Sequence, residues 1–186
     1  MHTGRQWLSM QVLNTPRLRL RPLVDEDAGF ILNLVNDADW LRFIGDKGVH
    51  NLADARRYIH QGPHAMYQHQ LGLLLVEGRT DAQALGLCGL LQRDYLPMAD
   101  LGFAYLPEAR GQGIGYEAAQ AVLAHAFNQQ GHSAVAALTA LDNQASIGLL
   151  SKLGFTMLGE RTFSGQAQPS KLFELTKTAW AELSPA

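Results

Sequence analysis

The chain has 186 residues, with 15 lysines and arginines, 17 aspartates and glutamates, and one cysteine. This length predicts one domain over residues 1–186 with its core at 14–176, because domains cluster at roughly 100–200 residues. A formal charge of −2 disfavours nucleic acid as the main partner, and a single cysteine excludes an intrachain disulfide. No apolar run approaches the ~18 residues of a membrane helix. Residues 1–6 lack the pattern of a signal peptide, so we expect a cytoplasmic protein, monomeric or homodimeric, that binds no membrane.

The N-terminal third predicts one strand and two helices. Residues 17–21 alternate arginine and leucine, which is the period of a half-buried strand. Their arginines share a face that is either solvated or open to an anion. Acidic residues at 25–27 predict a helix start, and a second helix is predicted from the N-cap Asn51 to the Gly62-Pro63 break. The segment 36–46 between them mixes acidic and aromatic residues, and we expect a loop there that contacts a cationic amine.

The rest of the chain predicts a mixed sheet. Three apolar runs joined by short turns indicate an antiparallel meander over 71–77, 85–91 and 99–106. A glycine-rich loop follows, and then a helix is predicted at 116–129, a strand at 134–141 and a short helix at 146–153. The last two strands, 156–163 and 171–176, are predicted to form a hairpin. The expected fold class is α/β (α+β), a mostly antiparallel central sheet of about six to seven strands with helices on both faces.

The densest chemical signal is the run Arg110-Gly111-Gln112-Gly113-Ile114-Gly115 between a strand and a helix. Glycines at this spacing let backbone N–H groups converge on one anion, and the helix N-terminus and Arg110 add positive charge. A nucleotide P-loop is excluded because Tyr116 and Glu117 replace its Lys-Ser/Thr pair. A dinucleotide fingerprint is disfavoured because 118–141 hold no acidic residue for the ribose. Coenzyme A and a turn without ligand are the other interpretations.

Several segments resemble one family. Arg-x-x-Gly-x-Gly at 110–115 is similar to the acyl-CoA signature of the GNAT acetyltransferase superfamily. The helix from Asn143 to Lys152-Leu153-Gly154-Phe155 resembles a later motif of the same family. With 15–21 and 99–103, these segments resemble the branch of ribosomal-protein N-terminal alanine/serine acetyltransferases. The resemblance covers 14–176 and implies a GNAT fold, acetyl-CoA as co-substrate, no metal, and direct acetyl transfer to a primary amine in a ternary complex.

The resemblance also assigns site residues. The strand before the loop would hold the pantetheine arm and support the oxyanion, while the loop would hold the pyrophosphate. The expected cofactor-binding residues are Phe103, Ala104, Tyr105, Leu106, Arg110, Gly111, Gln112, Gly113, Ile114, Gly115, Tyr116, Asn143 and Ser146. Asp100 stands where relatives often carry a glutamate, and it is a base, a charge that orients the amine, or a solvated strand residue. Leu150 replaces the tyrosine that often protonates the leaving thiolate, so Ser146 is the candidate acid, unless it is an ordinary helix serine.

The acceptor is either a protein N-terminus or a small-molecule amine. The expected substrate-binding residues are Trp40, Phe43 and Asp100. Cys88, inside an apolar run, is expected to be an inert buried thiol. Three histidines are expected on the surface or in loops rather than on a metal, namely His60, His64 and His69. A different class of function stays open, an acyl-CoA-binding or regulatory module with little or no turnover, and an NAD-binding oxidoreductase is a distant third.

Overall fold

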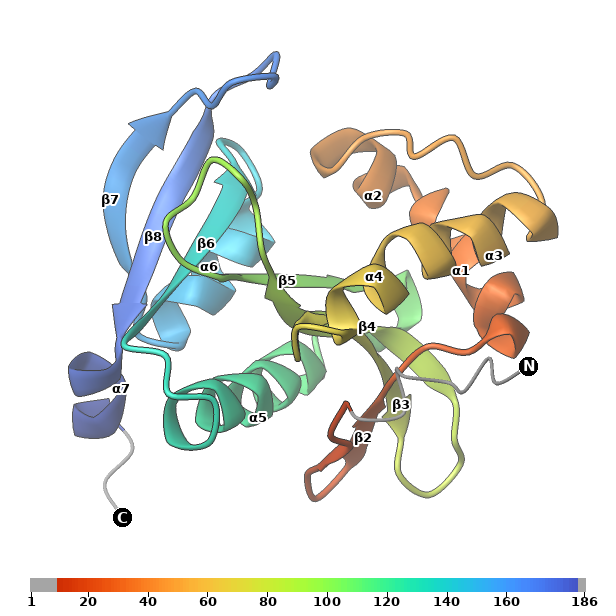
Figure 1. Cartoon of the computed structure of the whole chain (residues 1–186), viewed down its shortest axis with the longest axis horizontal. Helices are drawn as coiled ribbons and strands as arrows, with labels where there is room; N and C mark the ends of the chain where they lie inside the picture. Colours follow the sequence, from red (N-terminus) through yellow and green to blue (C-terminus); the bar gives the residue numbers. More distant parts are fainter. Residues whose placement is uncertain (1–9, 184–186) are drawn as a thin grey trace.

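The computed structural model describes residues 10–183, which form an eight-stranded sheet flanked by helices (Figure 1). Residues 1–6, for which the sequence predicts no signal peptide, lie outside the described residues. The strands are β1 (Leu13–Asn14), β2 (Leu18–Arg21), β3 (Gly72–Gly78), β4 (Ala84–Leu91), β5 (Asp100–Tyr105), β6 (Ala134–Ala140), β7 (Thr156–Arg161) and β8 (Ser170–Thr176). The α-helices are α1 (Ala28–Val35), α2 (Ala38–Phe43), α3 (Leu52–Gln61), α4 (Pro63–Tyr67), α5 (Ile114–Asn128), α6 (Gln144–Lys152) and α7 (Lys177–Leu183). One short 3-10 helix lies before each of α1 and α5: η2 (Asp25–Asp27) precedes α1, and η3 (Pro107–Ala109) precedes α5.

The strand order is β1-β2-β3-β4-β5-β6-β8-β7. Neighbouring strands are antiparallel except for β5 and β6, which are parallel and share only the pair Asp100 and Ala136. Beyond that pair the two strands diverge, and Figure 1 shows them splayed apart. The sheet is therefore divided into a β1–β5 half and a β6–β8 half that meet at one end of a gap.

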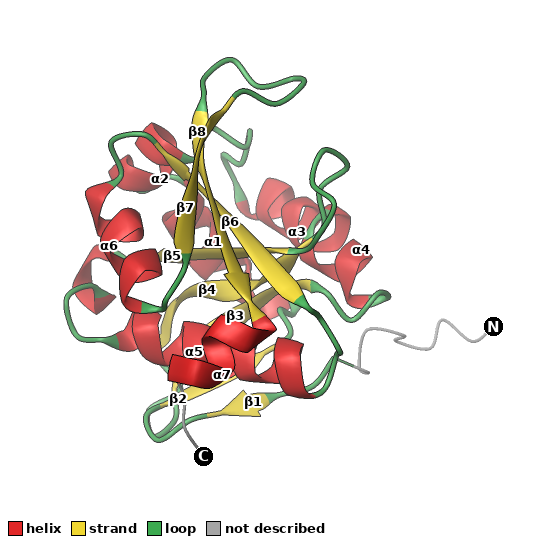
Figure 2. Cartoon of the chain, turned by 90° about the vertical axis from the view of Figure 1, so that its left-hand side faces the viewer, coloured by secondary structure: helices red, strands yellow, loops and turns green. Residues whose placement is uncertain are grey.

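Each face of the sheet has its own apolar core. On one face, α1 and α3 pack on β3 and β4 through residues such as Ile31, Ile59 and Leu87. On the other face, the alanine-rich α5 packs against the sheet through Ala118, Ala119 and Phe127. Figure 2 shows α5 and α7 in front of the sheet and α1 and α3 behind it. None of the described helices is long and apolar enough to cross a membrane.

The expected mixed, mostly antiparallel sheet is confirmed, with the meander β3-β4-β5 and the hairpin β7-β8. The sheet has eight strands rather than six or seven, because the two-residue β1 is too short to leave a periodic signal. The expected N-cap of α3 is also present, since the Asn51 side chain accepts from the Asp54 amide at 2.9 Å. The expectation of a loop over 36–46 is wrong in part, because α2 forms there with Asp37 as its N-cap.

Candidate functional site

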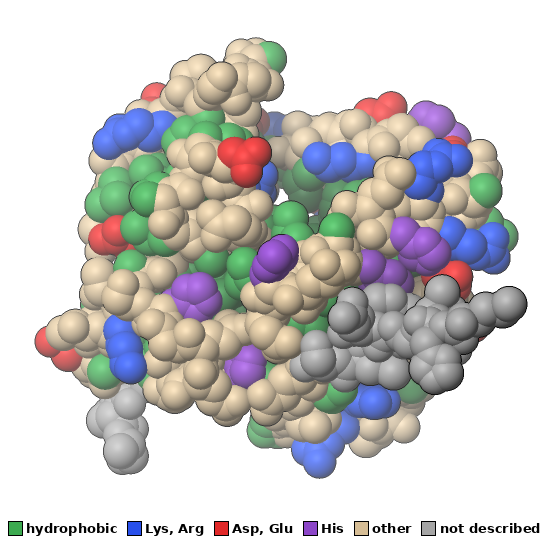
Figure 3. Space-filling view, viewed as in Figure 1, with side chains coloured by type: hydrophobic (Ala, Val, Ile, Leu, Met, Phe, Trp, Pro, Cys, Tyr) green, Lys and Arg blue, Asp and Glu red, His purple; other side chains and the backbone are tan. Residues whose placement is uncertain are grey.

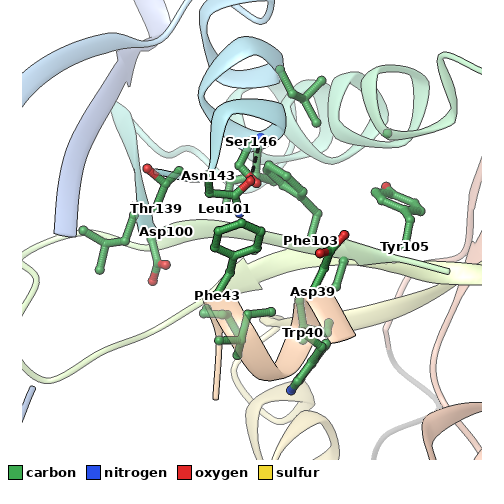
Figure 4. Close-up of a pocket in the computed structure, with 18 of the residues that line it drawn as sticks. Asp39, Trp40, Phe43, Asp100, Leu101, Phe103, Tyr105, Thr139, Asn143 and Ser146 are labelled. Carbon is green, nitrogen blue, oxygen red and sulfur yellow. Dashed lines mark hydrogen bonds between the residues drawn. The ribbon is translucent and has the colours of Figure 1, made fainter. Parts of the chain in front are cut away.

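A cavity of about 830 Å³ lies where the two halves of the sheet separate. Its lining comes from β5, the β4–β5 loop, α2, β6, α6 and the glycine loop before α5. Figure 3 shows the hollow between the two halves of the molecule, and Figure 4 shows side chains from these elements converging on it. The three expected substrate-binding residues, Trp40, Phe43 and Asp100, all line the cavity. So do all the expected cofactor-binding residues except Leu106 and Gln112.

One edge of β5 is open toward this cavity. Every residue of β5 pairs with β4, whereas only Asp100 of β5 pairs with β6. Backbone N–H and C=O groups on the open edge are therefore free of a strand partner, and an extended ligand can pair with them as an added strand does.

The hydrogen-bond directions of β5 identify the donors on the open edge. The Leu106 amide donates to the Leu85 carbonyl in β4 at 3.0 Å. Because these directions alternate along a strand, Ala104 also faces β4, while the amides of Phe103 and Tyr105 face the cavity. Of the four expected residues, Ala104 and Leu106 therefore direct their N–H groups to the β4–β5 ladder, and the N–H groups of Phe103 and Tyr105 are the ones directed to the cavity.

The glycine loop leads directly into α5. Gly111 and Gly113 have φ values of 72° and 76°, in the left-handed region that glycine adopts without strain. Gly115 has a different role, since a Cβ there would lie 3.2 Å from the Tyr105 ring and 3.3 Å from Leu149. Within residues 10–183 no side chain caps the N-terminus of α5, so its first backbone N–H groups remain available beside the cavity. The arrangement suits a phosphate or pyrophosphate group.

Arg17, immediately before β2, braces this loop from outside the cavity. Its Nη1 donates to the Gln112 carbonyl at 3.0 Å, and its Nε pairs with Glu117 at 2.6 Å. Burial opposes ionisation of Glu117, but hydrogen bonds from Thr15 and Arg17 outweigh it and lower the pKa of that carboxyl group. Gln112 is thus a point of attachment for Arg17 and does not line the cavity. The arginines of β2 are likewise ion-paired instead of simply solvated, as Arg19 and Arg21 both contact Glu77.

Arg110 is the first residue of the loop, and its guanidinium makes four hydrogen bonds to other parts of the protein. It donates to Asp37 at 2.7 Å, to Asp39 at 2.5 Å, and through Nε and Nη2 to the Tyr105 carbonyl at 3.0 and 2.8 Å. Although burial opposes the shift, Arg110 lowers the pKa of Asp37. The expected cation is present, but its charge is shared with two carboxylates of the α2 region.

The opposite wall of the cavity is the start of α6. Asn143 is its N-cap, and its Oδ1 accepts from the Ser146 amide at 3.2 Å. Ser146 also lines the cavity, and Figure 4 shows it beside Asn143. Leu150, which replaces the tyrosine common in the resembled family, is fully buried in the core. Lys152 lies 4.4 Å from the centre of the Tyr116 ring, which places a cation next to the first turn of α5.

Asp100 is one of the most deeply buried carboxylates, with 1% of its surface exposed, and not a solvated strand residue. The Arg93 Nε group donates to both of its oxygens at 3.0 and 3.1 Å. Burial raises the pKa of Asp100 above its usual range, against the opposing charge of Arg93. Arg93 also donates to the Tyr95 hydroxyl at 3.2 Å, and Gln166 does so from the β7–β8 loop at 2.8 Å. This network joins two loops at one end of the cavity.

Two buried polar groups of the cavity wall stand out, one on Trp40, which the sequence predicts as substrate-binding, and one on Thr139, which sequence reasoning missed. Trp40 and Thr139 are 5% and 7% exposed, yet Trp40 Nε1 and Thr139 Oγ1 have no hydrogen-bond partner within the described part of the chain. Both residues line the cavity, where such groups are available to a ligand. Arg93 was also missed, although the hairpin register, Leu91 opposite Asp100, brings it close to that carboxylate.

The cysteine and the histidines stand outside the site. Cys88 is fully buried, and burial raises its pKa to about 12, as suits an inert thiol. His64 is buried instead of lying on the surface, since its Nε2 contacts the Leu23 carbonyl at 2.7 Å and its ring stacks on His60. Over residues 10–183 no three His, Cys, Asp or Glu side chains are grouped to hold a metal ion.

Comparison with known proteins gives consistent matches over most of the chain. The family model of the acetyltransferase (GNAT) domain matches residues 17–156. The uncharacterized N-acetyltransferase YoaA of Bacillus subtilis (strain 168) is 30% identical over 152 residues, which are 80% of this chain and 84% of that protein. An acetyltransferase structure from Agrobacterium tumefaciens str. C58 has a TM-score of 0.76 at 19% identity, covering 90% and 95% of the two chains. The ribosomal L7/L12 alpha-N-protein acetyltransferase RimL, in complex with coenzyme A, has a TM-score of 0.73 at 16% identity, covering 89% and 98%. At these identities the two solved structures share the fold.

Proposed function

The chain belongs to the GNAT acetyltransferase family, and on this premise we propose that it transfers the acetyl group of acetyl-CoA directly to a primary amine in a ternary complex. The acceptor is a protein N-terminus or a small-molecule amine. Bound acetyl-CoA supplies a thioester carbonyl that an amine can attack. The observation that carries the proposal is the open edge of β5 next to the glycine loop, which offers a strand partner and an anion cradle in one cavity.

The residues present suit coenzyme A. The pyrophosphate would lie on the left-handed glycines Gly111 and Gly113 and on the uncapped first turn of α5. The amide-containing pantetheine arm would pair with the backbone of Phe103 and Tyr105, and Asn143 would contact it from the opposite wall. A cavity of about 830 Å³ has the volume of an ordinary ligand site.

Two groups of this chain would support the leaving thiolate and the oxyanion. An N–H group on the open edge of β5, from Phe103 or Tyr105, would donate to the thioester oxygen as negative charge develops on it. Ser146 would donate a hydrogen bond from its hydroxyl to the thiolate and relay a proton to it, regaining one from water as it does so. Leu150 has no proton to give and faces the core, so the acid must come from elsewhere on α6 or from water.

Asp100 would serve the acceptor nitrogen. A buried carboxylate with a raised pKa can accept a proton from an ammonium group, directly or through water, and it also attracts that cation. The Arg93 contact holds the carboxylate in one orientation at the end of the cavity. Asp100 is therefore the proposed base or orienting charge of the acceptor site.

Calorimetric titration with CoA and acetyl-CoA tests the cofactor site. Gly113→Glu would add a negative charge to the glycine loop, with its Cβ 3.4 Å from Arg17 Nη2, and should weaken CoA binding at least about 10-fold by repelling the pyrophosphate and disturbing the loop. Gly131→Glu is the matched control, since Gly131 has φ +75°, close to that of Gly113, with no atom within 4 Å of an added Cβ. The control should bind CoA like the wild type. If the wild-type protein binds neither CoA nor acetyl-CoA, the proposed function is wrong.

A second function is an acyl-CoA-binding or regulatory module with little turnover. Two observations favour it, the apolar Leu150 in place of the usual acid and the pairing of Asp100 with Arg93. A thiol-release assay with acetyl-CoA and panels of peptides and small amines separates the two functions. Thiol release that depends on one acceptor class supports the enzyme, whereas CoA binding without release across both panels supports the module.

A further inference from the structure

Helix α2 carries much of the acceptor side of the cavity, but few apolar contacts hold it. Asp39, Trp40 and Phe43 all line the cavity from this six-residue helix, and Figure 4 shows Phe43 between Asp100 and Phe103. Trp40 is the one buried residue of α2. Leu41 and the following Ile44 are 42% and 45% exposed. Apolar burial alone therefore provides little to fix the orientation of this short helix.

Ion pairs supply the missing attachment. Arg110 reaches across from the glycine loop and binds the N-cap residue Asp37 at 2.7 Å and Asp39 in the first turn at 2.5 Å. The same guanidinium binds the Tyr105 carbonyl at the end of β5, so one side chain joins that strand to α2. A second ion pair, Arg42 with Asp142 at 2.8 Å, has side chains that are 63% and 64% exposed, and solvent weakens it.

The charges around Arg110 leave it little capacity for a cofactor anion. Its single positive charge faces the two negative charges of Asp37 and Asp39, so this group has a net charge of −1. A pyrophosphate that took the guanidinium would leave both carboxylates unpaired next to its own negative charge, which is unfavourable at this spacing. The glycine loop offers the anion backbone donors instead.

We infer that Arg110 is a positioning residue of the acceptor site, whose guanidinium holds α2 against the end of β5 and so fixes Trp40 and Phe43 in the cavity. The inference rests on the proposed function for its kinetic consequence. Arg110 and the neighbouring glycines then have different roles. The glycines contact the cofactor through their backbone, and the Arg110 side chain positions the acceptor site.

The kinetic test uses Arg110→Met in the full-length protein. The KM for the amine acceptor should rise about 10-fold or more, while the dissociation constant of CoA changes by less than about 3-fold. Arg110→Lys keeps the charge but cannot reach both carboxylates and the Tyr105 carbonyl, so it should restore part of the acceptor affinity. Asp37→Asn/Asp39→Asn should resemble Arg110→Met, and combining them should add little, because they remove the same contact. Arg57→Gln is the control, since Arg57 pairs with Asp54 on α3.

A second measurement needs neither turnover nor an identified acceptor. In a Trp7→Phe/Trp180→Phe background, Trp40 is the remaining tryptophan and reports on α2. Because Trp40 is 5% exposed, acrylamide should quench it weakly, and Arg110→Met should raise the quenching constant about 2-fold or more. If Arg110→Met weakens CoA binding about 10-fold and leaves Trp40 quenching and acceptor KM unchanged, Arg110 is a cofactor ligand and the inference is wrong. Failure of the wild type to bind CoA would overturn the proposed function alone, because the quenching result would still decide the role of Arg110.

Discussion

Replacing Arg93 with methionine would leave the Asp100 carboxylate without its guanidinium partner. Asp100 is 1% exposed and Arg93 Nε donates to both of its oxygens. Removing one partner of a buried ion pair costs about 3–5 kcal/mol, and since the Arg93 side chain is 36% exposed, screening reduces this to about 2–3 kcal/mol at pH 7.5. Urea unfolding monitored by circular dichroism measures the difference in free energy of unfolding.

The loss of unfolding free energy in Arg93→Met should increase as the pH rises. Burial raises the pKa of Asp100 in the folded protein, so its contribution to stability is greatest below the unfolded pKa of about 3.9 and is lost as the pH rises through the folded pKa. Arg93 opposes that shift, and Arg93→Met raises the pKa of Asp100 further. The variant should therefore lose more stability than the wild type between pH 5 and pH 7.5, and the difference between them should be smaller at pH 5.

A double variant separates charge from packing. Arg93→Met/Asp100→Asn removes both charges and should recover most of the lost stability, because an unpaired buried charge no longer remains. Arg57→Met, on the solvated face of α3, controls for the loss of an arginine. An equal loss at pH 5 and pH 7.5, or a double variant as unstable as Arg93→Met, would refute the electrostatic explanation and assign Arg93 a packing role with Tyr95.

Two further substitutions test the core under β5 and the proposed acid. Gly86→Ala should destabilise the protein by about 3 kcal/mol, since its Cβ would overlap the Tyr105 ring and the Ala104 carbonyl oxygen. Thermal and urea unfolding measure this change, and a loss below about 0.5 kcal/mol would contradict the packing. Ser146→Ala keeps the backbone amide that Asn143 accepts from, so the α6 cap should persist. Its kcat in the thiol-release assay should fall roughly 10- to 100-fold with unchanged CoA affinity, and an unchanged kcat would assign thiolate protonation to water.

Local patterns predicted most of the fold. The meander was visible because apolar runs and turn residues alternate over 71–106, and the α3 start was visible because Asn51 is a strong N-cap signal. The glycine loop was visible because Gly111 and Gly113 need left-handed backbone angles that few other residues tolerate. Each of these signals lies within a few residues of the element it specifies.

The parts that sequence reasoning missed depend on distant partners. Helix α2 spans about one and a half turns, too few for an apolar period, and its ionic anchor Arg110 lies 71 and 73 residues after the aspartates it binds. The Arg17 brace joins residues 100 positions apart. Asp100 is buried where β5 meets β6 at Ala136, and neither strand's own residues encode that contact.

The near-neutral composition is compatible with the proposed anion-binding role of the glycine loop because the site is built from paired charges. Four cationic side chains line the cavity, and the two arginines among them, Arg93 and Arg110, are bound to carboxylates. Outside the cavity, Arg17 is bound to Glu117. The arginine pairs fix the geometry of the two ends of the cavity, and the backbone N–H groups of the glycine loop and of β5 are left to contact the ligand. An anion held mainly by backbone donors requires no net positive charge on the chain, so a protein of formal charge −2 can bind one compact polyanion.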